Sequence, residues 1–106
     1  GEDGTIAGFL AQGGHGCISV TANVAPKLTS MLHYYWQKKN YKEFDKVNLR
    51  LASLSKILFA EPNPTPAKYA LSLMGKCKAD IREPLYELSP ETKKQVRKTI
   101  KDLNFI

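Results

Sequence analysis

The residues with the most evident chemical potential lie together in "GGHGCISVTANVAP", residues 13–26. Glycines surround His15, and Cys17 follows two positions later. A glycine-rich turn next to a strand and a helix start can hold a phosphate group on its backbone N–H groups. The same pattern also occurs at one strand-to-helix step of a barrel. The sequence therefore poses a choice between a phosphate site and a structural turn.

His15 and Cys17 also invite a metal or nucleophile interpretation, because residues i and i+2 of a strand share a face. Two ligands do not make a zinc site, however, and no third ligand lies near them in the sequence. A reactive cysteine would need an adjacent base or a helix N-terminus. We therefore expect a turn histidine, an inert buried cysteine and no metal site.

The elements that would position these residues follow from the apolar pattern. Residues 3–12 read as a short helix, with Asp3 as its N-cap and with Gly13 and Gly14 as a left-handed C-cap. Residues 16–21 are apolar without clean alternation, which is typical of a strand buried on both faces of a parallel sheet. The sequence predicts one strand here.

The rest of the chain is predicted to be helical. Helices are expected over 26–39, over 41–59, from near Pro66 to Gly75, and from Ser89 onward, where a cap, a proline and an acid stand in order. The prolines of "EPNPTP", residues 61–66, exclude a helix there, and residues 76–88 look irregular. A lone buried strand leaves its backbone groups unpaired, so these residues are expected to be part of something larger.

Composition limits the class of protein. The chain has 106 residues and a net charge of +6, and all 16 basic residues lie within 27–106. No stretch reaches the roughly 18 apolar residues of a membrane span, and the acidic start does not resemble a signal peptide. With only two cysteines, a reducing cytoplasm is the default expectation.

A basic face on the last helix offers one alternative function. It consists of Lys93, Lys94, Arg97, Lys98 and Lys101. A stand-alone helical module that binds nucleic acid or a protein is therefore conceivable, but no recognition motif accompanies the charges. A solvated lysine-rich face explains them as well, so we expect neither a nucleic-acid partner nor a membrane partner.

The motifs "GED", "GGHGCISVTANVAP" and "FAEPNPTPAKYAL" resemble the C-terminal part of the dihydrodipicolinate synthase family, with matching spacing from residue 1 to residue 106. The resemblance implies a parent (β/α)8 TIM barrel with a C-terminal helical extension. This piece would be mostly α, with strand eight only. Residues 1–39 would be the last part of the barrel, comprising the end of strand seven, helix seven, strand eight and helix eight. Residues 40–106 would be the C-terminal helical extension.

In this family, a class I aldolase-type lyase condenses pyruvate with aspartate 4-semialdehyde in lysine biosynthesis, through a Schiff base on a barrel lysine. The resemblance implies no metal or organic cofactor. It also places the catalytic lysine and tyrosines on earlier strands, so no catalytic residue lies in this chain, which alone would be inactive. A related pyruvate-dependent lyase of the N-acetylneuraminate lyase type stays an alternative.

The resemblance further implies site residues and partners. Gly1 matches a strand-seven glycine beside pyruvate, and Ile18 matches a strand-eight isoleucine that packs on the Schiff base. Glu2, Asp3 and Asn63 match positions at the pocket rim. Active sites of such barrels lie at the carboxyl ends of strands, so the glycine turn before strand eight would face away from the chemistry. The intact enzyme would be a cytoplasmic homotetramer, with Gly8, Ala11 and Gln12 as a candidate contact.

Overall fold

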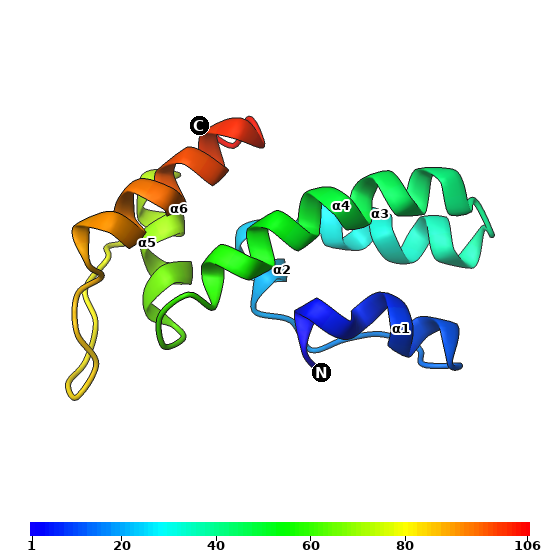
Figure 1. The fold of residues 1–106 in the computed structure, drawn as a ribbon, viewed down its shortest axis with the longest axis horizontal. Coiled ribbons are helices and arrows are strands. Elements are labelled where there is room, and N and C mark those ends of the chain that lie inside the picture. The colour runs from blue at the N-terminus through cyan, green and yellow to red at the C-terminus, as the bar shows by residue number, and fades with distance from the viewer. The chain divides into compact units, whose positions relative to one another are not determined.

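Helices and irregular connections make up the whole computed structural model, which describes residues 1–106 and contains no strand. The elements in chain order are η1 (Asp3–Thr5), α1 (Ile6–Ala11), α2 (Thr21–Val24), α3 (Pro26–Gln37), α4 (Tyr41–Leu58), α5 (Thr65–Leu73) and α6 (Pro90–Asp102) (Figure 1). The chain divides within α4 into two compact units, Gly1–Ser55 and Lys56–Ile106. The mostly helical character expected from the sequence is confirmed. No helix is both long enough and apolar enough to cross a membrane.

The first helical stretch ends as the glycines predict. Gly13 has a φ of +98°, in the left-handed region that favours glycine. The amide of Gly13 donates to Leu10 O at 3.1 Å, and the amide of Gly14 donates to Phe9 O at 2.9 Å. A Cβ on Gly14 would lie 2.2 Å from the Phe9 ring, so the ring would have to move to admit a side chain there. The pair of glycines therefore closes α1.

The prediction of a strand over residues 16–21 is wrong for these residues. Residues 14–19 form an irregular connection, and Thr21 already begins the short helix α2. A strand needs a neighbour that pairs with its N–H and C=O groups, and the chain contains no second extended segment that does so. The apolar pattern is real, but the backbone pairing that defines a strand is not formed.

Helices α3 and α4 form an antiparallel hairpin in the first unit (Figure 1). Lys39, with a φ of 56°, makes the tight turn between them. Trp36 on α3 packs against Tyr41 and Phe44 on α4, with ring centroids 5.4 and 5.3 Å apart respectively. The buried side chains that hold the hairpin recur at helical spacing, as predicted: Leu28, Leu32, Phe44, Val47, Leu51 and Leu54.

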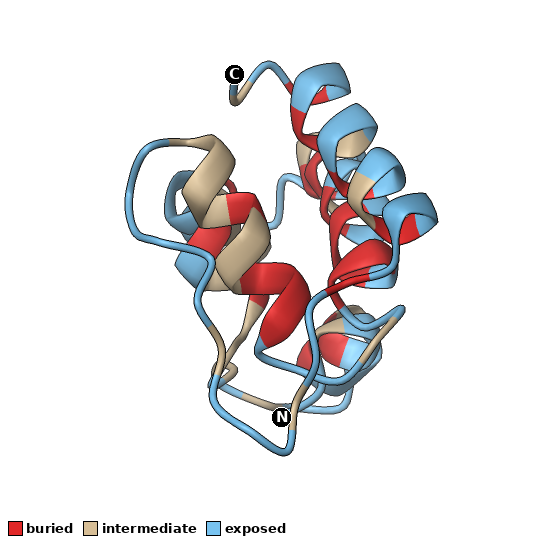
Figure 2. Cartoon of the chain, turned by 90° about the vertical axis from the view of Figure 1, so that its left-hand side faces the viewer, coloured by how far each residue is buried: buried red, intermediate tan, exposed pale blue.

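The second unit is built from α5 and α6, which pack against each other; buried residues gather in the first turns of α5 and along one side of α6 (Figure 2). Ala67 and Ala70 of α5 and Val96 and Ile100 of α6 are all buried. Proline stands in the first turn of both helices, as predicted. The proline-rich connection 61–64 and the segment 76–88 are non-helical, also as predicted.

Glu61 fastens the proline-rich connection to the start of α6. Its Oε2 accepts hydrogen bonds from the Ser89 amide at 3.2 Å and the Ser89 hydroxyl at 3.1 Å. Ser89 in turn caps α6, because its Oγ accepts the Thr92 amide at 3.2 Å. Hydrogen bonding from the Thr92 hydroxyl, joined by the two bonds from Ser89, lowers the pKa of Glu61 below its ordinary value.

This pKa shift predicts that the second unit loses stability in acid. A carboxyl group with a lowered pKa in the folded state stabilises the protein above its unfolded pKa, near 4.5, and that contribution disappears as pH falls through the folded pKa. Glu61→Gln should therefore flatten the dependence of the unfolding free energy on pH below about 5. Urea unfolding followed at several pH values measures this dependence.

Glu83→Gln is the matched control, since Glu83 is exposed in the irregular segment and makes no hydrogen bond or ion pair. Identical pH dependence in the two variants would contradict the role of Glu61.

Candidate functional site

Two residues predicted to bind substrate, Gly1 and Ile18, line the same hollow in the first unit. The hollow has a volume of about 400 Å³, and Glu2, Phe9 and Cys17 also border it. Ile18 is 93% exposed. An isoleucine this exposed, next to a recess with a largely apolar lining, presents a surface suited to contact with other groups. The structure thus brings together three of the five predicted site residues.

Gly1 approaches the segment that carries Ile18 very closely. A Cβ on Gly1 would lie 2.8 Å from Cys17 Sγ, so a side chain there would require the thiol to move. Partial burial raises the pKa of the Cys17 thiol, and the nearby Asp3 carboxylate raises it further. The thiol is therefore protonated at neutral pH, which agrees with the expected inert cysteine. It is half-buried, rather than fully buried as a double-sided strand would have made it.

Asp3 does not form the helix N-cap predicted for it. It does not cap its own helix, since η1 and α1 have no side-chain cap. Its Oδ2 instead accepts the amides of Val20 at 3.0 Å and Thr21 at 3.1 Å, and its Oδ1 accepts the Ser19 hydroxyl. The prediction of a local N-cap is wrong because the partners lie 16 to 18 positions away in the sequence.

The start of α2 is consequently capped by two side chains. Besides the two amides held by Asp3, the Ala22 amide donates to Ser19 Oγ at 2.9 Å. This arrangement joins residues 1–3 to the turn directly after Ile18. We define these contacts of Asp3 with residues 19–21 as the Asp3 clamp. The clamp fixes the spacing between the two segments that border the hollow.

The other predicted rim residue, Asn63, belongs to the second unit. It is exposed in the proline-rich connection, and its peptide bond to Pro64 is cis. The position of Asn63 at a pocket rim stays a prediction.

The glycine-rich turn is not a phosphate cradle. The amides of Gly13 and Gly14 are already donated to the end of α1, so they are not free for an anion. His15 is exposed, and no group of three or more potential metal ligands lies together. Of the two interpretations, a phosphate site or a structural turn, the hydrogen bonds of Gly13 and Gly14 favour the structural turn.

The basic face of α6 is partly neutralised by its neighbours. Lys98 pairs with Asp102 at 3.0 Å, and Lys93 pairs with Glu87 while lying 5.8 Å from the centre of the Tyr69 ring. No lysine borders the hollow that Gly1 and Ile18 line. Two of the five cations of this face, Lys93 and Lys98, are thus paired with a carboxylate.

Comparison with known proteins identifies the family. The model of the dihydrodipicolinate synthetase family matches residues 1–103, so the chain belongs to that family. The 4-hydroxy-tetrahydrodipicolinate synthase of Bradyrhizobium diazoefficiens is 48% identical over 97 residues, covering 92% of this chain and 33% of that protein. The enzyme of the same name from Ehrlichia canis is 45% identical over the whole chain and 36% of its own length. The chain spans about a third of the length of the curated relatives that it matches.

Solved structures agree with the sequence comparison. A monomeric dihydrodipicolinate synthase variant superposes with a TM-score of 0.96 at 37% identity, covering the whole chain and 35% of that protein. The chloride-inhibited dihydrodipicolinate synthase from Acinetobacter baumannii, complexed with pyruvate, gives a TM-score of 0.92 at 38% identity and covers the whole chain and 36% of that protein. The helices described above thus match the C-terminal helical part of these TIM-barrel enzymes.

The Asp3 clamp predicts a specific loss of stability. Asp3→Ala leaves the buried Thr21 amide and the Val20 amide without their acceptor, which should lower the free energy of unfolding by about 1–3 kcal/mol. Urea unfolding of the protein at its natural length measures this loss. Asp45→Ala, on the exposed face of α4, is the matched control and should change the free energy by less than about 0.5 kcal/mol. Equal stability of the two variants would show that the clamp contributes nothing.

Proposed function

We propose that this chain forms part of a class I aldolase-type lyase that condenses pyruvate with aspartate 4-semialdehyde to give 4-hydroxy-tetrahydrodipicolinate in lysine biosynthesis. The observation that carries the proposal is the family match over residues 1–103, together with relatives named for that product. A pyruvate complex of a solved neighbour supports pyruvate as one substrate. Residues 1–39 belong to the last part of the barrel in this proposal, and residues 40–106 to its helical extension.

The chain's part in the reaction is to supply a wall of the substrate pocket. Ile18 presents an apolar surface beside the imine, and the backbone of Gly1 leaves room for pyruvate. An apolar wall disfavours the ammonium form of a neighbouring lysine, which keeps its amine available as a nucleophile. The amine adds to the pyruvate carbonyl and water leaves, so the imine forms without a metal or an organic cofactor. The lysine and the proton-relaying tyrosines are contributed by residues outside 1–106.

Glu2, Asp3 and Asn63 take rim positions in this proposal, where polar groups can orient the second substrate. The Asp3 carboxylate also holds the clamp, which fixes its own position. A cytoplasmic location fits these substrates.

The first test of the reaction is reductive trapping. The protein at its natural length is incubated with pyruvate and borohydride, which reduces the imine C=N bond to a stable amine, and its intact mass is measured. We expect a mass gain of one reduced pyruvate per chain. A protein that turns over substrate without trapping pyruvate would contradict the Schiff-base proposal, and cleavage of N-acetylneuraminate in place of condensation would assign the chain to the alternative lyase.

The variant Ile18→Ala sharpens this test. Loss of the apolar wall should lower kcat/KM for pyruvate about tenfold, equivalent to about 1.4 kcal/mol. Leu49→Ala is the matched control, since Leu49 is also exposed, at 73%, and lies on α4 away from the hollow. Equal kinetics for the two variants would remove Ile18 from the pocket wall.

A homotetramer is the proposed assembly, with the exposed face of α1 at a subunit contact. Gly8 and Ala11 are exposed there beside Gln12, and small side chains allow close approach of a partner helix. Ala11→Arg should therefore reduce the mass measured by light scattering below that of the unaltered protein. The control Ser53→Arg, on the exposed face of α4, should leave the mass unchanged. No difference between the two variants would exclude this contact.

A further inference from the structure

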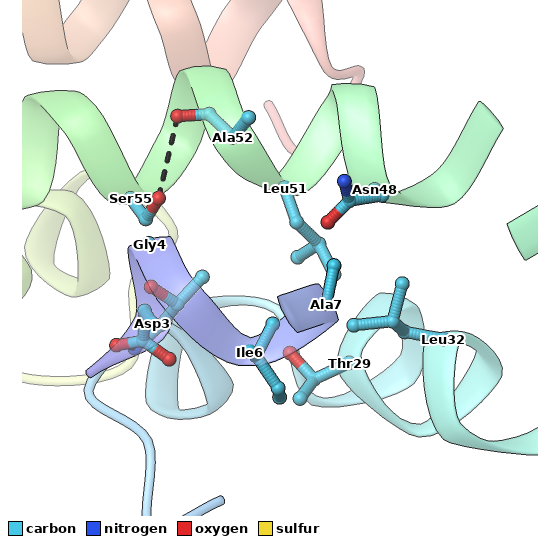
Figure 3. A pocket seen from close by; sticks show the side chains of 11 residues that line it. Asp3, Gly4, Ile6, Ala7, Thr29, Leu32, Asn48, Leu51, Ala52 and Ser55 are labelled. Atoms are coloured by element: carbon cyan, nitrogen blue, oxygen red, sulfur yellow. Dashed lines mark hydrogen bonds between the residues drawn. The ribbon is translucent and has the colours of Figure 1, made fainter. Parts of the chain in front are cut away.

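A second, smaller cavity lies in the first unit, apart from the hollow at Gly1 and Ile18. Its volume is about 80 Å³. Side chains from several elements surround it (Figure 3). Apolar residues form much of its lining, but Asp3, Thr21, Thr29, Asn48 and Ser55 add polar groups to it. A closed apolar void of this size would stay dry, whereas polar groups at several points of the wall favour water.

Thr21 supplies the decisive observation. Its side chain is almost fully buried, at 2% exposed, and its Oγ1 has no hydrogen-bond partner in the protein. The Thr21 backbone is satisfied, since its amide donates to Asp3 and its carbonyl accepts the Ala25 amide at 2.9 Å. Buried hydroxyl groups without a partner are rare because the lost solvation costs free energy. The hydroxyl therefore needs a partner that residues 1–106 do not supply.

The other polar groups that line the cavity can form further hydrogen bonds with such a partner. Thr29 Oγ1 donates to Ala25 O at 2.9 Å, and Ser55 Oγ donates to Ala52 O at 3.3 Å. Each hydroxyl that donates its only proton keeps lone pairs that can accept. The Asn48 side chain offers both amide donors and a carbonyl acceptor, and Figure 3 shows it on α4 on the same side of the cavity as Ser55.

We propose that this cavity holds at least one ordered water molecule, bonded to Thr21 Oγ1 and bridging it to Asn48 and to the hydroxyls of α3 and α4. A water molecule needs roughly 10–15 Å³ of such volume and two to four polar partners, and the cavity meets both requirements. The water would join the turn after Ile18 to the helical hairpin, so it is a structural component of the first unit. The proposal does not depend on the proposed reaction.

Thr21→Val tests the proposal by stability, because valine has the same shape and lacks the hydroxyl. If water is bound, the variant removes the hydrogen bond between that water and residue 21 and leaves the water with one partner fewer. The melting temperature should then fall by roughly 2–4 °C. Without water, the variant removes an unsatisfied polar group, and the melting temperature should stay the same or rise. Thr99→Val is the matched control, because the Thr99 hydroxyl is half-exposed on α6 and bonds Gln95 O at 3.0 Å.

A high-resolution crystal structure of the protein at its natural length gives the direct test, and it decides even if the variant fails to fold. A water peak within hydrogen-bond distance of Thr21 Oγ1 and of a second cavity residue is the expected result. An empty cavity overturns the proposal, as does a rise or no change in the melting temperature of Thr21→Val. The double variant with Asn48→Ala should be less destabilised than the sum of its parts, because both side chains lose the same water. Strict additivity would also overturn the bridge.

Discussion

The Asp3 carboxylate is the constraint on which the rest of the first unit depends. Residues 14–19 have no strand partner within the chain, so no ladder of backbone hydrogen bonds fixes where they run. The clamp fixes them at their far end, through the Ser19 hydroxyl and the amides of Val20 and Thr21. It thereby sets where α2 begins, and α2 leads within one residue into α3 and the hairpin. A single carboxylate links the segment at Gly1 to the core of the unit.

The second unit uses the same device in a simpler form. Glu61, in the proline-rich connection, accepts hydrogen bonds from Ser89, the N-cap of α6. In both units an acidic side chain from one segment satisfies the donors at the start of a distant helix, where the helix dipole also favours negative charge. Each acid thus has a structural role within its own unit, and the position of Asp3 at the pocket rim stays a prediction.

Local signals in the sequence predict the helices well. Ser89, Pro90 and Glu91 mark the start of α6 because capping and proline preferences act within one turn, and Gly13 marks the end of α1 for the same reason. The strand over 16–21 and the cap role of Asp3 are predicted wrongly, since both depend on partners far away in sequence or outside residues 1–106. Helix α2 is missed because Thr21 falls within the predicted strand. For the site, the sequence names Gly1, Glu2 and Ile18, which share one hollow, but gives no sign of the cavity beneath Thr21.

The glycines that first suggested phosphate chemistry differ in what restricts them. Gly14 is confined by the Phe9 ring, and Gly13 by its left-handed backbone, whereas Gly16 has an ordinary φ and no atom within 4 Å of the place that a Cβ would take. The three glycine positions should therefore differ in how readily they accept another residue. A library of substitutions should admit alanine at Gly16 more readily than at Gly14, where the Phe9 ring would have to move, so that an aromatic ring, and not an anion, favours glycine there.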